Sequence, residues 1–118
     1  MVKIDLHTHS TRSDGLDSPT DLMINAKKAG LEVIALTDHD TVSGWDEARG
    51  KAFELGLGFV PGIEVTSVSD VERFGRTIRI SVHLLAYLPD PDHKALEIVL
   101  GDTVATREAR GRAIVEKL

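Results

Sequence analysis

The sequence predicts an α/β fold with about four mainly parallel strands and flanking helices. Residues 2–9 and 31–40 have the apolar pattern of strands, and each is followed by a segment with the signals of a helix, residues 18–30 and 43–56. Strands that alternate with helices in this way pair in parallel through right-handed crossovers. The chain order therefore favours a sheet whose strands end at the same edge.

The first predicted strand, residues 2–9, has one apolar and one polar face. Its sequence "VKIDLHTH" alternates in the period-two pattern of a half-buried strand, and the polar face carries Asp5, His7 and His9. The helix predicted next, over residues 18–30, has both of its ends marked. Ser18 is a candidate N-cap, Pro19 suits the first helical position, and Gly30 ends the helix.

The second predicted strand, residues 31–40, is a nearly continuous apolar run that ends in polar residues. This pattern is typical of a strand covered on both faces in a parallel sheet. The helix predicted over residues 43–56 repeats the Ser-x-x-Asp opening, with Ser43 as N-cap and Asp46 three residues later. Gly56 is expected to end it.

Two further strands and a helix are predicted in the second half of the chain. Residues 57–67 form a strand candidate in which the Pro-Gly pair at 61–62 indicates a kink or bulge. A polar connection leads to a fourth strand over residues 76–87. The rest, residues 89–118, has a helical pattern in which Gly101 is either a break or a weak point.

Length and composition limit the class of protein. A chain of 118 residues, 42% of them apolar, suits one small domain with a modest core. The net charge of −5 gives no basic surface for long nucleic acid, and the absence of cysteine leaves imidazole and carboxylate as metal ligands. No apolar run suits a signal peptide or a membrane span, so we expect a cytoplasmic protein with no membrane partner.

Each predicted strand carries titratable side chains near its carboxyl end, where α/β folds place their functional sites. An ionised carboxylate inside the apolar stretch "FVPGIEVT" needs a cation nearby. One arrangement explains all four strand ends, namely a cluster of divalent cations held by nitrogen and oxygen ligands. The candidate ligands and their neighbours are His7, His9, Asp38, His39, Asp40, Glu64 and His83.

Each candidate also has an ordinary structural explanation. A His-x-His pair is short and common, His83 could be a core histidine bonded to backbone, and Asp38 could cap a turn. Asp14, in "SDG", has in isolation the pattern of a turn residue. His93 lies in a polar stretch and is expected on the surface without a role. The ordinary explanations must all be true independently of one another. A shared set of bound cations explains all the candidate residues with a single assumption.

Two common enzyme classes lack their motifs in this chain. There is no Gly-x-Ser-x-Gly elbow for a Ser-His-Asp hydrolase and no Gly-rich loop of the P-loop or dinucleotide-binding kind. Arg12, beside the first histidine pair, could contact a phosphate but is as well explained as a solvated side chain. The sequence therefore favours chemistry performed by bound metal ions.

Four ordered motifs resemble the PHP (polymerase and histidinol phosphatase) family of metal-dependent phosphoesterases. They are "DLHTHSTRSDG", "ALTDHDTVSG", "VPGIEVT" and "SVHLLAY", and the resemblance is strongest to stand-alone members that act on nucleotides and short oligonucleotides. The resemblance implies a distorted seven-stranded β/α barrel with two or three manganese, zinc or iron ions. By this resemblance His7 and His9 bind one ion, Glu64 bridges it to a second bound by His83, and Asp14 and His39 belong to a third.

The chain also departs from the family pattern. The family has a further histidine and an Asp-x-His pair nearer the C-terminus, and no residue after His93 can supply them. We therefore expect residues 1–118 to be a single PHP-type domain that is the N-terminal part of a longer barrel. Its open edge would be covered by the remaining part of the barrel or by a second copy.

The expected function is hydrolysis of a phosphomonoester, a nucleotide or a short oligonucleotide by a metal-activated hydroxide. No side chain is expected to act as the nucleophile. Histidinol phosphate and the 3′ end of a nucleic acid are the alternative substrates within the family. A non-catalytic metal-binding or assembly module is the alternative from another class, and a set of ligands that no longer binds metal is a third.

Overall fold

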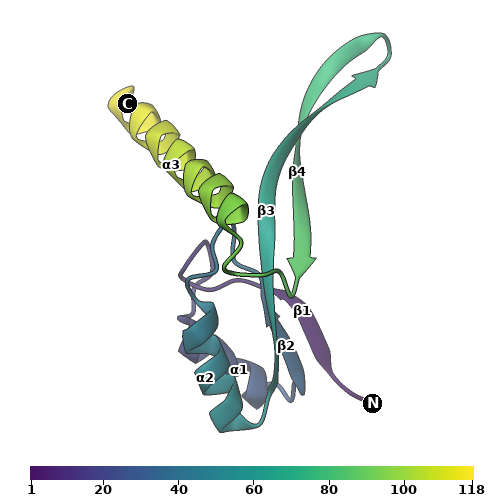
Figure 1. Ribbon diagram of the computed structural model, residues 1–118, viewed down its shortest axis with the longest axis vertical. Coiled ribbons are helices and arrows are strands. Elements are labelled where there is room, and N and C mark those ends of the chain that lie inside the picture. Colours follow the sequence, from purple (N-terminus) through teal and green to yellow (C-terminus); the bar gives the residue numbers. More distant parts are fainter.

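The first half of the chain alternates strands and helices, as the sequence predicts. The computed structural model describes residues 1–118, and Figure 1 shows the strands β1 and β2 beside the helices α1 and α2. The bounds of these elements are β1 Ile4–Thr8, α1 Pro19–Lys28, β2 Val33–Leu36 and α2 Trp45–Leu55. The second half contains β3 Gly58–Arg73, β4 Arg76–Tyr87 and α3 Lys94–Glu116.

The four strands form one sheet in the order β1-β2-β3-β4. The pairs β1–β2 and β2–β3 are parallel, so the predicted mainly parallel pairing is confirmed for the first three strands. The pair β3–β4 is antiparallel. A strand that follows its neighbour after two residues can only return in the antiparallel direction.

The polar connection predicted after residue 67 is wrong. Residues 68–73 continue β3, and the strand turns into β4 through Phe74 and Gly75, whose φ angles are both positive, at 52° and 71°. Two such residues form the tight turn that matches the twist of a hairpin. Polar residues are tolerated on both sides of this part of the hairpin because most of its side chains are exposed.

The Pro61–Gly62 pair does not interrupt β3, in contrast to the predicted kink. It marks the point where β3 changes partner, because Pro61 is the last residue paired with β2 and Gly62 is the first paired with β4. A Cβ atom on Gly62 would lie 2.8 Å from Thr37 Cγ2 and 3.1 Å from Tyr87 Cδ1. Glycine is required here because side chains from both neighbouring segments approach the backbone.

The helix ends are predicted correctly for α1 and only in part for α2. Ser18 Oγ accepts the N–H of Asp21 at 3.0 Å, as expected of an N-cap. Ser43 does not cap α2, which is a correction: Gly44 occupies the cap position without a side-chain bond. A turn closed by the Trp45 N–H and the Val42 carbonyl delays the start of the helix.

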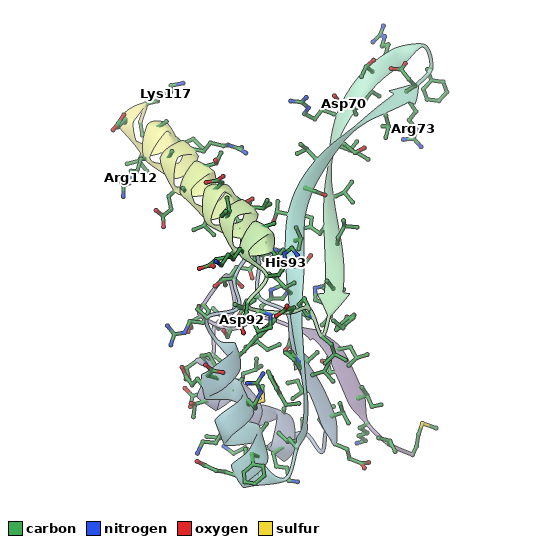
Figure 2. All side chains as sticks on the ribbon, in the orientation of Figure 1. Asp70, Arg73, Asp92, His93, Arg112 and Lys117 are labelled. Carbon is green, nitrogen blue, oxygen red and sulfur yellow. The ribbon has the colours of Figure 1, made fainter.

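The C-terminal helix α3 runs through Gly101 without a break. Of the two alternatives predicted for this glycine, the helix break is therefore wrong. The helix begins at Lys94 instead of residue 89, because prolines at 89 and 91 precede it. His93, labelled in Figure 2, is the N-cap, and its Nδ1 accepts the N–H of Leu96 at 3.4 Å. His93 is exposed, as predicted, and it has a structural role that the sequence did not indicate.

The core lies between the sheet and the two helices α1 and α2. These helices lie on the same side of the sheet in Figure 1, whereas α3 and the tip of the β3–β4 hairpin extend away from that body. None of the three helices combines the length and the hydrophobicity that crossing a membrane requires. The buried apolar side chains of the core include Met23, Ile34, Leu36, Trp45 and Ile63, and Leu100 of α3 belongs to the same cluster.

Candidate metal centre

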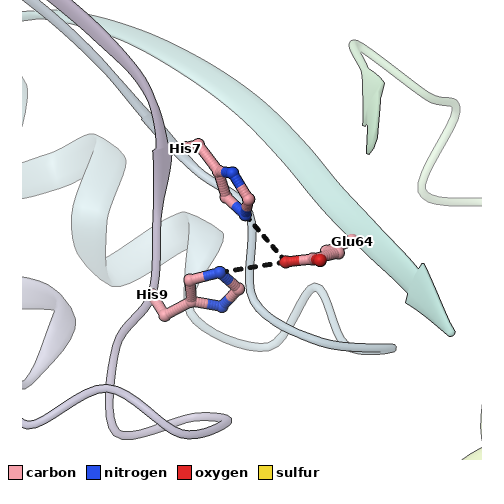
Figure 3. A group of neighbouring side chains, drawn as sticks. All are labelled: His7, His9 and Glu64. Carbon is pink, nitrogen blue, oxygen red and sulfur yellow. Dashed lines mark hydrogen bonds and ion pairs between the residues drawn. The ribbon is translucent and has the colours of Figure 1, made fainter. Parts of the chain in front are cut away.

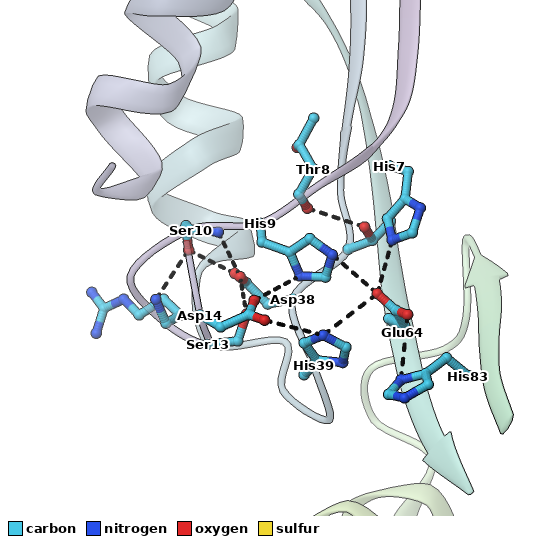
Figure 4. Close-up of polar contacts among 12 residues, drawn as sticks. His7, Thr8, His9, Ser10, Ser13, Asp14, Asp38, His39, Glu64 and His83 are labelled. Carbon is cyan, nitrogen blue, oxygen red and sulfur yellow. Dashed lines mark hydrogen bonds and ion pairs between the residues drawn. The ribbon is translucent and has the colours of Figure 1, made fainter. Parts of the chain in front are cut away.

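Four segments that are distant in sequence meet at one edge of the sheet. His39 follows β2 and forms a parallel bridge with Glu64 on β3. On the neighbouring strand β4, His83 lies opposite Thr66, two residues along β3 from Glu64. Figure 4 shows the resulting cluster, which contains all six predicted site residues: His7, His9, Asp14, His39, Glu64 and His83.

Glu64 lies at the centre of the cluster. Its Oε2 is 2.8 Å from His7 Nε2 and 3.0 Å from His9 Nε2, and Figure 3 shows both rings turned toward this oxygen. The same oxygen is 3.7 Å from His39 Nε2, and Oε1 is 3.4 Å from His83 Nδ1. One buried carboxylate on β3 therefore faces four imidazoles from three other segments, because His7 and His9 both belong to the β1 stretch.

Asp14 provides a second carboxylate on the other side of the histidines. Its Oδ1 is 3.3 Å from His9 Nδ1, and its Oδ2 is 3.5 Å from His39 Nε2. The explanation of Asp14 as a turn residue alone is therefore too narrow. The loop places its side chain against two of the histidines, and Asp14 is largely exposed, so a ligand from solvent can reach it.

The six residues form three overlapping groups of three, each with ligand atoms within 4.8 Å of one another. Neighbouring groups share a residue, because His9 belongs to the first and second groups and His39 to the second and third. The rings of His9 and His39 are stacked, with 4.6 Å between their centroids. The groups are His7–His9–Glu64, His9–Asp14–His39 and His39–Glu64–His83.

Two nitrogens in the cluster are buried without a hydrogen bond: His9 Nδ1, which has only the ion-pair approach of Asp14 Oδ1 at 3.3 Å, and His39 Nδ1. A buried polar atom left unpaired destabilises a fold, and native structures leave few of them. An imidazole nitrogen can instead use its lone pair to bind a metal ion. The set of imidazole nitrogens and carboxylate oxygens suits zinc, iron or manganese, so the residues present fit bound divalent ions.

The pKa of Glu64 is lowered from its ordinary value of 4.5. Burial raises this pKa and is the largest single influence, but the hydrogen bond with His7 and the positive charges of His39, His7 and His9 together outweigh it. Glu64 is therefore held as an anion at neutral pH. An anionic carboxylate is the form that binds a metal ion.

Asp38 holds the loop that carries His9 and Asp14. It is almost fully buried and accepts three hydrogen bonds of 2.7 Å, from the Ser10 N–H, the Ser10 hydroxyl and the Ser13 hydroxyl. The interpretation of Asp38 as a residue that caps backbone groups of a turn is correct in that its carboxylate accepts a backbone N–H, that of Ser10. The partners of Asp38 lie 25 and 28 residues away, so no local pattern could name them.

A cleft of about 590 Å³ opens beside the cluster. Its lining includes Asp14, His39 and His83 together with two arginines, Arg12 and Arg107. Arg12 is bound to Glu47, with 3.0 Å between Nη2 and Oε2. The cleft therefore joins the candidate metal ligands to cationic side chains.

Sequence reasoning missed Arg107 and left Asp40 with only a supporting role. Asp40 is buried, its Oδ1 accepts the Thr66 N–H at 2.7 Å, and its Oδ2 accepts a hydrogen bond from Arg107. Arg107 also donates to Thr66 Oγ1 at 3.0 Å. It is one of several arginines in the charge-rich helix α3, and no motif distinguishes it from the others.

Comparison with known proteins identifies a family and several relatives. A family model described as "PHP domain" matches residues 5–104. The 5′-3′ exoribonuclease of Haemophilus influenzae is 39% identical over 116 residues, which cover 98% of this chain and 39% of that protein. The 3′,5′-nucleoside bisphosphate phosphatase of Chromobacterium violaceum is 38% identical over 112 residues, which cover 95% of this chain and 36% of that protein.

A solved structure has the same arrangement of elements. A Bifidobacterium adolescentis protein assigned to the metal-dependent phosphoesterases superposes with a TM-score of 0.85 at 36% identity, covering 98% of this chain and 38% of that one. The predicted PHP-type α/β fold is confirmed. The chain spans less than two fifths of the length of the two curated relatives.

Proposed function

The chain belongs to the PHP domain family, and from this membership we propose that it forms the metal centre of a phosphoesterase. The proposed reaction is the hydrolysis of a phosphate ester on a nucleotide or a short oligonucleotide. The observation that carries the proposal is the position of Glu64, a buried anion faced by four imidazoles, two of which, those of His9 and His39, have a buried nitrogen without a hydrogen bond.

We assign the proposed ligands group by group. His7 and His9 would hold one ion, and Glu64 would link it to a second ion held by His83. Asp14 and His39 would hold a third. The three overlapping groups of nitrogen and oxygen atoms support this assignment, since each offers three ligand atoms within 4.8 Å of one another.

Bound divalent cations supply an activated water and neutralise phosphate oxygens. The chain's own residues position the proposed ligands and provide the negative charge that holds the ions. Glu64 keeps its negative charge at neutral pH because neighbouring histidines lower its pKa. Asp38 fixes the loop that presents Asp14 and His9, so the ligands are arranged before any ion or substrate arrives.

The names of the two relatives support a nucleotide substrate without fixing which bond is cut. One name describes cleavage of RNA, which breaks a phosphodiester, and the other describes a phosphatase of nucleoside bisphosphates, which breaks a phosphomonoester. The open cleft beside the cluster has room for a small phosphorylated compound. The net charge of −5 supports a small substrate rather than long nucleic acid.

The chain is further proposed to be part of a longer barrel. The relatives that it matches are more than twice its length, which supports this view. The family's further histidine and Asp-x-His pair would then lie on the remaining strands. A second copy covering the exposed edge of β4 is the alternative arrangement, and a non-catalytic metal-binding module is the alternative function.

The first experiment measures metal content and phosphate release together. The purified chain is incubated with manganese and desalted, and manganese per chain is measured by mass spectrometry. Phosphate released from adenosine 3′,5′-bisphosphate is measured on the same samples. We expect bound manganese and phosphate release in the wild type, and much less manganese per chain after desalting in Glu64→Gln, because a proposed ligand of two ions loses its charge.

Glu72→Gln is the matched control, because Glu72 lies on the same strand but near the exposed end of the hairpin. It should keep the metal content and the activity of the wild type. Bound manganese without phosphate release in the wild type would support the non-catalytic module instead. A wild type that binds no manganese would contradict the proposed centre.

A further inference from the structure

Arg107 connects the C-terminal helix to the metal centre. It reaches from α3 to Asp40, which follows the candidate ligand His39, and to Thr66 on β3. The same side chain lines the cleft together with His39 and His83. A cation contributed by a separate helix therefore stands beside the proposed site of phosphate cleavage.

The hydrogen bonds of Arg107 leave most of its donors unused. Both recorded bonds, to Asp40 Oδ2 and Thr66 Oγ1, come from Nη2, while a guanidinium carries five N–H groups on three nitrogens. About half of the side chain is exposed, at 49%. Asp40 thus fixes the position of the guanidinium, and the N–H groups on Nε and Nη1 remain available to a ligand in the cleft.

The other cation in the cleft, Arg12, belongs to a different network of hydrogen bonds. Arg12 donates through Nη2 to Glu47, a residue of α2 that also accepts the N–H and the hydroxyl of Thr20. This network ties Arg12 to the helices α1 and α2. Two carboxylates, Asp14 and Glu108, line the cleft as well, so an anionic substrate needs a fixed cation in addition to any metal charge.

We propose that Arg107 binds a phosphate oxygen of the substrate, with Asp40 holding the guanidinium in place. The proposal rests on the phosphoesterase function proposed above and adds the residue that recognises the anion. A planar guanidinium donates to two phosphate oxygens at once, which an ammonium group cannot do with the same geometry.

The test uses inorganic phosphate as the probe, titrated calorimetrically with and without manganese. Arg107→Ala should bind phosphate about 10- to 100-fold more weakly than the wild type, the range expected when a charge-assisted hydrogen bond is lost. Arg107→Lys keeps a positive charge that can pair with Asp40. It should fold as the wild type does and still bind phosphate more weakly, because the planar guanidinium is absent.

Arg112→Ala is the control, since Arg112 lies farther along the same helix, toward its free end (Figure 2). It should bind phosphate as the wild type does. Equal phosphate affinity of the wild type and Arg107→Ala, or no phosphate binding by the wild type, would overturn the role of Arg107. Full affinity in Arg107→Lys would show that a positive charge at this position suffices, and it would overturn the contact of a planar guanidinium with two phosphate oxygens.

Manganese content separates this inference from the proposed function. The wild type and Arg107→Lys should hold the same amount of manganese, because Arg107 is not among the proposed ligands. Absence of manganese from the wild type contradicts the metal centre, whereas equal metal content with equal phosphate affinity contradicts only the substrate contact. Melting temperatures of all variants, measured by circular dichroism, establish that each is folded.

Discussion

Glu47 joins three parts of the chain at the margin of the site. Its carboxylate accepts hydrogen bonds from Arg12 in the loop before α1 and from the N–H and hydroxyl of Thr20 within α1. These bonds, that of Arg12 first and that of Thr20 next, lower the pKa of Glu47 below its ordinary value of 4.5. The charged carboxylate therefore binds more favourably in the folded chain than the neutral form does.

Glu47→Gln should reduce stability in a pH-dependent way. A lowered pKa stabilises the fold above the unfolded value near 4.5, and this stabilisation is lost as the pH falls through the lower folded value. We expect a loss of roughly 0.2–1 kcal/mol at pH 7, because the pair is partly exposed to solvent. The loss should shrink toward zero in acid, as measured by urea unfolding at a series of pH values.

Asp46→Asn is the control for this prediction, because Asp46 is the neighbouring residue and is almost fully exposed, with only a surface ion pair to Arg49. It should change the urea midpoint little at any pH. The same difference between wild type and Glu47→Gln at every pH would show that the charge of Glu47 does not stabilise the fold.

At the scale of residues, the sequence predicts which side chains form the site better than it predicts which residues they form hydrogen bonds with. His7 and His39 follow from strand patterns, because they lie at the carboxyl ends of the parallel strands β1 and β2. Glu64 and His83 are also predicted near strand ends, but they lie inside the longer, antiparallel strands β3 and β4. The contacts of Asp38 and Arg107 do not follow, because they join positions 25 to 67 residues apart. Such pairs depend on how the elements pack.

At the scale of elements, Gly62 is the position where β3 passes between two neighbours. A Cβ atom there would lie 2.8 Å from Thr37 Cγ2, and Thr37 is fully buried. Glu64 lies two residues further along the same strand. A side chain at position 62 would therefore strain the sheet close to the site.

Gly62→Ala should destabilise the fold by about 1–3 kcal/mol, the usual effect of overpacking a buried position. Gly111→Ala makes the same substitution within α3, where a Cβ atom meets nothing within 4 Å. It should stabilise the helix by about 0.5–1 kcal/mol, because alanine favours the helix interior. Equilibrium unfolding measures both changes, and the same sign for the two variants would contradict the argument.

Local signals predicted most elements and failed where two signals competed. The Ser-x-x-Asp pattern at Ser43 is a sound cap signal, but the turn at Val42 and Trp45 takes precedence and the helix begins after Gly44. Residues 68–73, the β3 arm of the hairpin tip, lack the apolar alternation that marks strands, and the core covers little of them. The opposite arm, β4, keeps an apolar alternation at Ile78 and Ile80 and is predicted with its observed bounds although it is exposed.

At the scale of the whole molecule, the cluster takes side chains from all four strands of the sheet or from the residues that follow them. His9 follows β1, His39 follows β2, and Glu64 and His83 lie on β3 and β4. Ions that bind only the folded arrangement of these residues stabilise the entire chain by mass action. The proposed metal centre therefore predicts an effect on global stability as well as on chemistry.

Manganese should raise the melting temperature of the wild type, and EDTA should reverse the effect. At a concentration 100 times its dissociation constant, one bound ion contributes about 2.7 kcal/mol to the free energy of unfolding. Scanning calorimetry with increasing manganese measures the shift. His93→Gln is the control, because His93 caps α3 and is not among the proposed ligands, and it should show the full shift. An equal shift in Glu64→Gln would contradict binding at the cluster.

The two-residue turn of the β3–β4 hairpin restricts how the lengths of the two strands can change. Side chains alternate between the two faces of a strand, and Glu64 and His83 are diagonal neighbours on one face. Gain or loss of one residue within one arm would reverse the direction of His83. Equal changes in both arms at the exposed tip would leave that neighbourhood intact, so the tip is free to vary in length while the base is not.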